Sequence, residues 1–231
     1  MNTEEEGLVL LVNKPLEWTS FDVVNKLRYI LHTRKIGHAG TLDPLATGLL
    51  IVCAGKMTKK IEQFQAQEKA YTGTLVLGQT TPSYDLETEP TEAVDISSIT
   101  ESDVRTAALA FLGKIEQVPP AHSSVKIGGK RAYAMARKGK PVEMKPRAVE
   151  VLEFEVTACR FPEVDFRVVC SKGTYIRSLA HDLGQRLGVG AYLSALCRTR
   201  IGAYTVAEAE TLEQIRDRYA SAAMAHQPQN P

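Results

Sequence analysis

The sequence predicts an α+β fold, and the order and spacing of its elements lead to this prediction. Strand and helix candidates are interspersed along the 231 residues without the regular βαβ rhythm of a doubly wound sheet. Two alternating strand candidates, 149–156 and 164–170, are separated only by a short connection around Pro162, which is typical of neighbours in an antiparallel pair. With 44% hydrophobic and 24% charged residues, the composition is that of a globular chain with a sizeable core.

The N-terminal part predicts a strand, a helix and a second strand. Residues 8–12 form a short apolar run that ends at Asn13-Lys14-Pro15, as a buried strand before a turn would. Apolar residues then recur at helical spacing between 23 and 31, and Thr19 and Asp22 are placed as a capping box. The segment 37–44 is too rich in Gly and Pro for a regular element, and 49–53 is apolar again. Asp43 is therefore expected in a loop between a helix and a strand.

The rest of the chain continues the mixed pattern. Residues 71–77 alternate as a strand, and a polar connection over 79–98 precedes a helix over 103–112. A short helical candidate covers 131–138, and a strong helix with Thr174 as N-cap follows Gly173. No element is assigned to 191–202. A short helix is expected around 208–219, before a disordered tail. We expect one folded domain over 1–219 and a tail over 220–231.

Several classes of protein are disfavoured by what the sequence lacks. Its first six residues are acidic, and no apolar run approaches the length that crosses a bilayer, so we expect a cytoplasmic protein without membrane contact. The four cysteines show no Cys-x-x-Cys spacing and the five histidines no metal-ligand spacing, so no metal site is expected. There is no P-loop, and Gly37 to Gly40 lacks the third glycine of a dinucleotide fingerprint, which argues against a nucleotide cofactor.

Positive charge is concentrated in one segment, although the formal net charge is only +1. The basic stretch 114–147 holds nine Lys or Arg against two Glu, with Tyr133 interleaved. Such a density neutralises RNA phosphates by counterion release. The alternative is a solvated, flexible insertion, which repulsion between unused like charges disfavours. We expect an RNA-binding insertion, and its candidate contacts are Lys126, Lys130, Arg131, Lys138 and Lys140.

Two charged residues occupy unusual local positions. Pro44 stiffens the backbone of Asp43, which suits a nucleophile, although turn capping by Asp43 is the simpler interpretation from spacing alone. Arg177 falls in the first turn of its helix, where the macrodipole disfavours cations, so it could pair with a carboxylate or be a solvated surface arginine. Tyr71 by itself is only a good strand former. His38 and Lys14 by themselves resemble ordinary loop and turn residues.

Three segments taken together resemble the TruB family of tRNA pseudouridine synthases. They are Gly37-His-Ala-Gly-Thr-Leu-Asp-Pro-Leu-Ala-Thr-Gly48, Lys69-Ala-Tyr71 with its strand, and Cys170-Ser-Lys-Gly-Thr-Tyr-Ile-Arg177 with Asp182-Leu183-Gly184. The first segment is highly specific, and the resemblance covers roughly residues 8–205. It implies that the domain over 1–219 is catalytic. Members of the family commonly carry a C-terminal RNA-binding PUA domain, and none is expected here. The implied architecture is the pseudouridine synthase fold, a mixed and mainly antiparallel sheet flanked by helices.

The resemblance also implies the roles of individual residues. Asp43 matches the catalytic aspartate of the family, Tyr71 its active-site tyrosine stacked on the target base, and Arg177 the arginine paired with the aspartate. His38 matches a histidine that helps to hold the flipped RNA, and the basic stretch corresponds to a thumb. The remaining matched positions lie near the cleft or bind the target: Lys14, Leu196 and Asp85. Pro82 stands where many members have an acidic residue, so part of the uracil contact is expected to differ, and Cys197 stands where an arginine is common next to Arg198.

The implied reaction isomerises uridine 55 in the T loop of tRNA. The N1–C1′ glycosidic bond breaks and the uracil rejoins the ribose through C5, so no redox change occurs and no cofactor is expected. Asp43 attacks either C1′ or C6, and the sequence does not choose between them. The expected partner is the T loop and arm of tRNA, bound by a monomer. The alternatives are a non-catalytic RNA-binding or tRNA-folding chaperone module, and a nucleotide-dependent RNA-modifying enzyme, for which no nucleotide motif is found.

Overall fold

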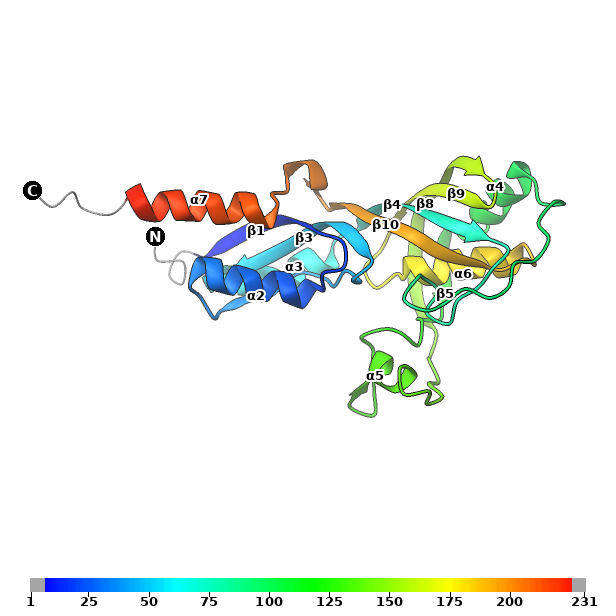
Figure 1. The fold of residues 1–231 in the computed structure, drawn as a ribbon, viewed down its shortest axis with the longest axis horizontal. Helices are drawn as coiled ribbons and strands as arrows, with labels where there is room; N and C mark the ends of the chain where they lie inside the picture. Colours follow the sequence, from blue (N-terminus) through cyan, green and yellow to red (C-terminus); the bar gives the residue numbers. More distant parts are fainter. Residues whose placement is uncertain (1–6, 226–231) are drawn as a thin grey trace, which may run out of the picture. The chain divides into compact units, whose positions relative to one another are not determined.

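The structure, a computed structural model, describes residues 7–225, with side chains described for 7–221. Its contacts divide the chain into two compact units (Figure 1). Unit 1 comprises Met1–Lys69 and Cys197–Pro231, and unit 2 comprises Ala70–Leu196. Strand β10 (Ala191–Ile201) contributes residues to both units.

Unit 1 is built on strand β3 (Ala46–Ala54), which pairs antiparallel with β1 (Leu8–Lys14) and with β2 (Ile36–His38). Its other neighbour in the sheet is β10, with which the short strand β11 (Tyr204–Thr205) also pairs. The register of β1 with β3 runs from Leu8 opposite Ala54 to Lys14 opposite Gly48. Asp43 therefore lies in the connection between β2 and β3.

Alternation along β1 and β3 gives the unit 1 sheet two apolar faces, because successive side chains of a strand point to opposite sides. On one face, Leu10, Leu50 and Val52 pack with helices α2 (Ser20–Leu31) and α7 (Leu212–Ala225). On the other face, Leu49 and Ile51 pack with Phe64 of α3 (Ile61–Ala66), which follows the 3₁₀ helix η1 (Gly55–Lys60). Both faces are thus covered by helices.

Unit 2 contains the remaining strands of the large sheet. Its strands lie in the order β10, β4 (Lys69–Leu77), β9 (Glu163–Cys170), β8 (Arg147–Arg160) and β5 (Gly113–Gln117). Helices α4 (Glu101–Leu109) and α6 (Ile176–Arg186) contact each other, and α4 packs on β8. Phe154 joins the core through an edge contact with Phe166 and a tilted ring contact with Phe111.

The insertion, residues 118–146 between β5 and β8, has a different character. It contains strands β6 (Lys126–Ile127) and β7 (Lys130–Arg131) and the short helix α5 (Ala132–Ala136). Gly128 and Gly129 connect β6 to β7 with φ of 55° and 79°, as a two-residue hairpin turn with both φ positive requires. Figure 1 shows α5 and its surroundings projecting from the strands of unit 2.

Most predicted elements are confirmed, including the antiparallel pair β8 and β9 and the capping box of Thr19 and Asp22. The predicted loop 37–44 was too long, because 36–38 pair with β3. Thr174 is not the N-cap of α6; Tyr175 is, while the Thr174 hydroxyl donates to the Ser171 carbonyl.

Strand β10 was not predicted at all, because buried Arg198 interrupts its apolar pattern. Helix α7 continues to Ala225, so the first residues of the expected tail are helical, and 226–231 lie outside the described residues. The division into two compact units does not decide whether 1–219 folds as a single domain, which stays a prediction.

Candidate active site and RNA-binding surface

The Asp43 loop, residues 40–44 of unit 1, has every one of its carbonyl oxygens hydrogen-bonded. The first two accept from the Arg198 guanidinium, with Nη2 3.0 Å from the Gly40 oxygen and Nη1 3.4 Å from the Thr41 oxygen. The Ser20 hydroxyl donates to the Leu42 carbonyl at 3.1 Å and accepts from the Leu42 amide at 2.8 Å. A loop held at successive residues has little freedom to change its backbone angles.

The remaining two carbonyls of the loop are held by local structure and by Lys14. The Ala46 amide donates to the Asp43 carbonyl at 3.0 Å, which closes the turn that Asp-Pro predicts. The Pro44 carbonyl accepts from the Glu17 amide at 2.8 Å and from Lys14 Nζ at 3.3 Å. The backbone thus forms the expected turn, and this geometry fixes the place from which the Asp43 carboxylate projects.

Lys14 and Arg198 are buried cations, an arrangement that is costly unless the charge is well hydrogen-bonded. Lys14 is fully buried and donates to the carbonyls of Pro15, Trp18 and Pro44. Arg198 is 1% exposed, and its Nε also donates to the Leu49 carbonyl at 2.8 Å. A neutral side chain would suffice to fill this space, so two buried cations beside Asp43 indicate a site built around a negative charge.

Glycine is required at position 48 by the approach of Arg198. Gly48 has a φ of 98°, and a Cβ added there would overlap the backbone of Arg198. Any side chain at 48 would therefore push β10 away from β3 within unit 1, and the guanidinium would lose its reach to the Asp43 loop.

Burial and charge together set the titration of the groups around the loop. Burial lowers the pKa of Lys14 to about 8, with the nearby Asp43 acting in the opposite direction and Arg198 adding to the decrease. Burial and the Arg198 charge also hold the pKa of half-buried His38 below its usual value, while a hydrogen bond to the Gly40 backbone raises it. His38 is therefore neutral at neutral pH.

Arg177 lies in unit 2, and its guanidinium is buried at 3% exposure. Nη1 donates to the Ser83 carbonyl at 3.1 Å and lies 3.5 Å from Asp85 Oδ2, and Nη2 donates to the His122 carbonyl at 3.0 Å. Burial excludes the solvated-arginine alternative. The position in the first turn of α6, unfavourable to a cation, is offset by these acceptors.

The loop around Asp85 is itself fixed inside unit 2. The hydroxyls of Thr81 and Ser83 both donate to the Asp85 carbonyl, at 2.7 and 3.0 Å. The Glu87 amide donates to Asp85 Oδ1 at 3.0 Å, so the carboxylate caps the turn with one oxygen and faces Arg177 with the other. The departure at Pro82 leaves this arrangement possible, because proline at 82 is exposed and needs no partner for its nitrogen.

Tyr71 and Leu196 lie on neighbouring strands of unit 2. Tyr71 is the third residue of β4 and is 8% exposed, and Leu196 is partly buried on β10, which is adjacent to β4. Gly73 allows the two strands to approach, since an added Cβ would lie 2.6 Å from the Ala195 oxygen. The strand pairing thus explains how two residues 125 positions apart come onto one sheet.

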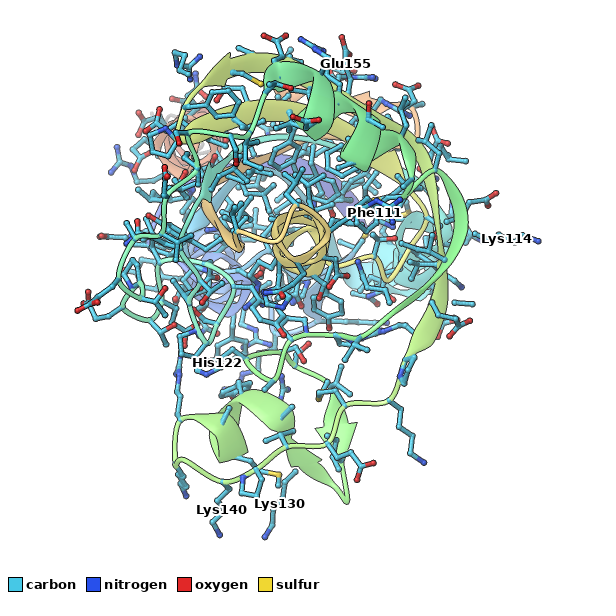
Figure 2. The ribbon with its side chains drawn as sticks, turned by 90° about the vertical axis from the view of Figure 1, so that its right-hand side faces the viewer. Phe111, Lys114, His122, Lys130, Lys140 and Glu155 are labelled. Carbon is cyan, nitrogen blue, oxygen red and sulfur yellow. The ribbon has the colours of Figure 1, made fainter. Side chains whose placement is uncertain are left out.

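The predicted RNA contacts of the basic stretch are exposed, as a phosphate-binding surface requires. Lys126 pairs with Arg131 across the β6–β7 hairpin, as Ile127 does with Lys130. Figure 2 shows Lys130 and Lys140 at the far edge of the insertion, with side chains that point away from the rest of unit 2. Lys114 lies instead on β5 of the sheet, so the projecting part of the basic stretch begins after it.

The structure thus groups the predicted residues by unit. Unit 1 holds Asp43 with Lys14 and His38, and unit 2 holds Arg177 with Asp85, as well as Tyr71, Leu196 and the insertion. The pairing of Asp43 with Arg177 stays a prediction. Sequence reasoning missed Arg198 and Ser20, although an arginine within an otherwise apolar and small-residue segment was a signal for the first. Glu87, and His122 of the insertion that it contacts, left no sequence signal.

Solved structures share the fold of this chain. The crystal structure of an archaeal box H/ACA sRNP Nop10-Cbf5 complex matches 97% of this chain and 57% of that chain with a TM-score of 0.72 and 27% identity. A Cbf5-Nop10-Gar1 complex matches 96% of this chain and 57% of that one, with a TM-score of 0.75 and 31% identity. The chain spans little more than half of those structures, whose shared region has the pseudouridine synthase fold.

The amino-acid sequence matches the models of one protein family. Residues 28–176 match the TruB family pseudouridylate synthase (N terminal domain), and residues 177–229 match the tRNA pseudouridylate synthase B C-terminal domain. A tRNA pseudouridine synthase B from Flavobacterium johnsoniae is 52% identical over 218 residues, 90% of this chain and 95% of the relative. One from Chloroherpeton thalassium is 48% identical over 96% of this chain and 94% of the relative. The chain belongs to the TruB family of pseudouridylate synthases.

Within residues 7–225, no helix is both long enough and apolar enough to cross a membrane.

Proposed function

We propose that this protein is a tRNA pseudouridine synthase that isomerises uridine 55 in the T loop of tRNA, with Asp43 as nucleophile. The observation that carries the proposal is the Asp43 loop, whose five carbonyl oxygens are all hydrogen-bonded and which lies beside two buried cations. The relatives named tRNA pseudouridine synthase B, about half identical over nearly the whole chain, support the reaction and the substrate.

Asp43 supplies a carboxylate of fixed position in this proposal. It forms a bond to C1′ of the ribose or to C6 of the uracil, the N1–C1′ bond breaks, and the base rotates. C5 then bonds to C1′, and the bond to Asp43 breaks, which restores the free carboxylate. The proton at C5 is lost to solvent and N1 gains one, so atoms balance without a cofactor. A nucleophile that does not need to be ordered on binding avoids part of the entropic cost of the reaction.

Arg177 and Tyr71 complete the proposed site. Arg177 keeps the Asp43 carboxylate ionised and oriented, because a buried guanidinium favours the charged form of a nearby carboxyl. Its rigid support by Ser83, Asp85 and His122 suits that role. Tyr71 offers an aromatic face on which the flipped base stacks, and stacking offsets part of the few kcal/mol that flipping costs.

RNA binding is assigned to the insertion and to residues near Asp43. The exposed cations Lys126, Lys130, Arg131, Lys138 and Lys140 contact phosphates of the T arm, and His38 helps to hold the flipped nucleotide. Lys14 supports the loop from within, and Asp85 and Leu196 border the target. We also propose that the protein works as a monomer in the cytoplasm, without a metal or nucleotide cofactor.

A tritium-release assay tests the nucleophile. With tRNA labelled at uracil C5, the wild-type protein is expected to release tritium, and Asp43→Asn to release it at least about 10⁴-fold more slowly. Asparagine has the size of aspartate and leaves the backbone hydrogen bonds in place, so thermal unfolding and tRNA binding serve as controls. Release by Asp43→Asn at the wild-type rate would show that Asp43 is not the nucleophile.

The rival function is an RNA-binding or tRNA-folding module without chemistry, which the exposed cations of the insertion favour. It predicts that the wild-type protein binds or refolds tRNA but releases no tritium. Sequencing of pseudouridines in tRNA from a deletion strain separates the two functions. Position 55 is unmodified in that strain if the protein is the enzyme, and is modified as usual if the protein only binds or refolds tRNA.

A further inference from the structure

Glu87 is a partly exposed carboxylate in an acidic segment of unit 2, and it contacts two side chains of the insertion that are far from it in the sequence. Arg137, which directly follows α5 in the insertion, donates from Nε and Nη2 to Glu87 Oε1 at 2.9 and 2.7 Å. His122 Nδ1, at the start of the insertion, lies 3.5 Å from the same oxygen. Glu87 therefore connects the start of the insertion, at His122, and the C-terminal end of α5, at Arg137, to the loop 83–87.

The same two segments hold Arg177 through their backbones. The His122 carbonyl accepts from Arg177 Nη2 at 3.0 Å, and the Ser83 carbonyl accepts from Nη1 at 3.1 Å. The Glu87 amide caps Asp85, whose other oxygen faces Arg177. Contacts therefore run from the Arg137 side chain to Glu87 and His122, and from the backbones of the same two segments to the Arg177 guanidinium. Figure 2 shows His122 near the junction of the insertion with the rest of unit 2.

The hydrogen bonds inside the insertion are local by comparison. The amides of Ala132 and Tyr133 donate to the carbonyls of Val125 and Ser123, seven and ten residues away. The ion pair of Arg137 with Glu87 spans 50 residues. The start of the insertion is held on α6 by the Ser178 hydroxyl, which donates to the Val118 carbonyl at 2.8 Å, and by Arg177 through the His122 carbonyl. The ion pair with Glu87 holds the residue that follows α5.

Burial strengthens this contact relative to an ordinary surface pair. The side chains of Glu87 and His122 are 26% and 10% exposed, while Arg137 is 58% exposed and also lies over the Tyr133 ring, 5.5 Å from its centroid. Partial burial alone would raise the pKa of Glu87, but the hydrogen bonds and charges of Arg137 and His122 bring it below its ordinary value. The carboxylate is therefore ionised at neutral pH.

We propose that Glu87 is a positioning residue, which holds the insertion through Arg137 in the place where RNA bound to it is aligned with the support of Arg177. This inference rests on the proposed function. A carboxylate repels phosphates, so Glu87 itself does not add to RNA binding, and alignment of the insertion accounts for its contact with Arg137. Its removal is expected to leave affinity intact while slowing the reaction.

Single-turnover rates at saturating enzyme and equilibrium tRNA binding test this pattern. Glu87→Gln is expected to lower the maximal rate about three- to tenfold, with the dissociation constant unchanged or lower. Glu89→Gln is the matched control, because it removes an exposed carboxylate two residues away, and both values should stay at wild type. Lys138→Gln should give the opposite pattern, with weaker binding and a smaller change in maximal rate.

Charge exchange tests whether the partner is Arg137. Glu87→Arg and Arg137→Glu are each expected to slow the reaction, and the double variant should recover rate relative to both single variants. In the RNA-free protein, hydrogen exchange reports the contact independently of catalysis. The amides of Arg137 and Lys138, which donate to the carbonyls of Tyr133 and Met135, should exchange about two- to fivefold faster in Glu87→Gln.

The outcomes separate this inference from the proposed function. If wild-type protein releases no tritium from tRNA, the proposed function fails, and the alignment role fails with it even where the exchange result confirms the contact. If wild type is active, the inference is overturned by a maximal rate of Glu87→Gln equal to wild type, or by a defect that appears only in the dissociation constant. Thermal unfolding near the wild-type temperature shows that the variants are folded.

Discussion

The Asp43 loop and the insertion are held in opposite ways. In the loop, five successive carbonyls accept hydrogen bonds, several of them from side chains buried more than 95%. In the insertion, Ser123 and Ala132 are buried, while its lysines and arginines are exposed, and one of its contacts with the loop 83–87 is a partly exposed ion pair. The first region is held at every residue, whereas the second exposes the side chains that carry its charge.

This difference matches the function proposed for each region, which is catalysis for the Asp43 loop and phosphate binding for the insertion. A nucleophile gains rate from a fixed position, because an error of about 1 Å can cost about 10²-fold in rate. A phosphate-binding surface gains from adaptable cations, because screened charges act over several ångströms and tolerate small displacements. The residues that hold a region, and not only those that react, therefore indicate what it does.

Breaking the support of the loop is expected to have the largest effect. Arg198→Lys keeps the charge, but an ammonium cannot reach the carbonyls of Gly40, Thr41 and Leu49 together. The maximal rate of tritium release should fall about 10²-fold, and the free energy of unfolding should fall by about 2–4 kcal/mol.

The matched control for that variant is Arg200→Lys. Arg200 lies two residues further along β10, where it pairs with Glu68 at 2.7 Å and is 29% exposed. Its replacement should change the free energy of unfolding by less than about 1 kcal/mol and leave the rate near wild type. A normal rate in Arg198→Lys, despite lower stability, would reduce Arg198 to a purely structural residue.

Weakening the insertion should instead change affinity, and by less. Lys138→Gln and Lys140→Gln should each reduce the slope of log K against log salt by about one unit if each lysine contacts one phosphate. Lys26→Gln on α2, outside the insertion, is the control with one exposed charge removed. Filter binding of tRNA at several salt concentrations measures the slope, and equal slopes in all proteins would mean that neither lysine contacts phosphate.

The smallest expected effect is a change of stability with pH that comes from Asp182, in the part of unit 2 outside the insertion. Burial raises the pKa of Asp182, on α6, to about 6 from an ordinary 3.8. The folded state then binds a proton more strongly than the unfolded state between those values, so this group stabilises the fold at low pH and the contribution is lost as pH rises through 6.

Asp182→Asn removes that dependence. Relative to wild type, the variant should be more stable at pH 8, and the advantage should shrink on acidification to pH 5. Denaturant unfolding at several pH values measures it, and the salt slope of RNA binding should stay as in wild type because Asp182 lies outside the insertion. An advantage of equal size at pH 5 and pH 8 would contradict a raised pKa for Asp182.

The sequence by itself determined the features that neighbouring residues encode. The capping box of Thr19 and Asp22, the turn at Asp43-Pro44 and the antiparallel pair around Pro162 all depend on short spacings, and all were predicted. The resemblance to the TruB family also rested on contiguous motifs. Charge density alone indicated the exposed surface of the insertion.

Only the tertiary structure decided which buried side chains support those features. Ser20 lies 22 residues from Leu42, Arg198 lies 158 residues from Gly40, and Arg177 lies 94 residues from Ser83. These pairs depend on which strands and loops become neighbours, which local periodicity does not encode. Strand β10 was missed for the same reason: Arg198 looks out of place in a strand until the carbonyls of the Asp43 loop are brought to it.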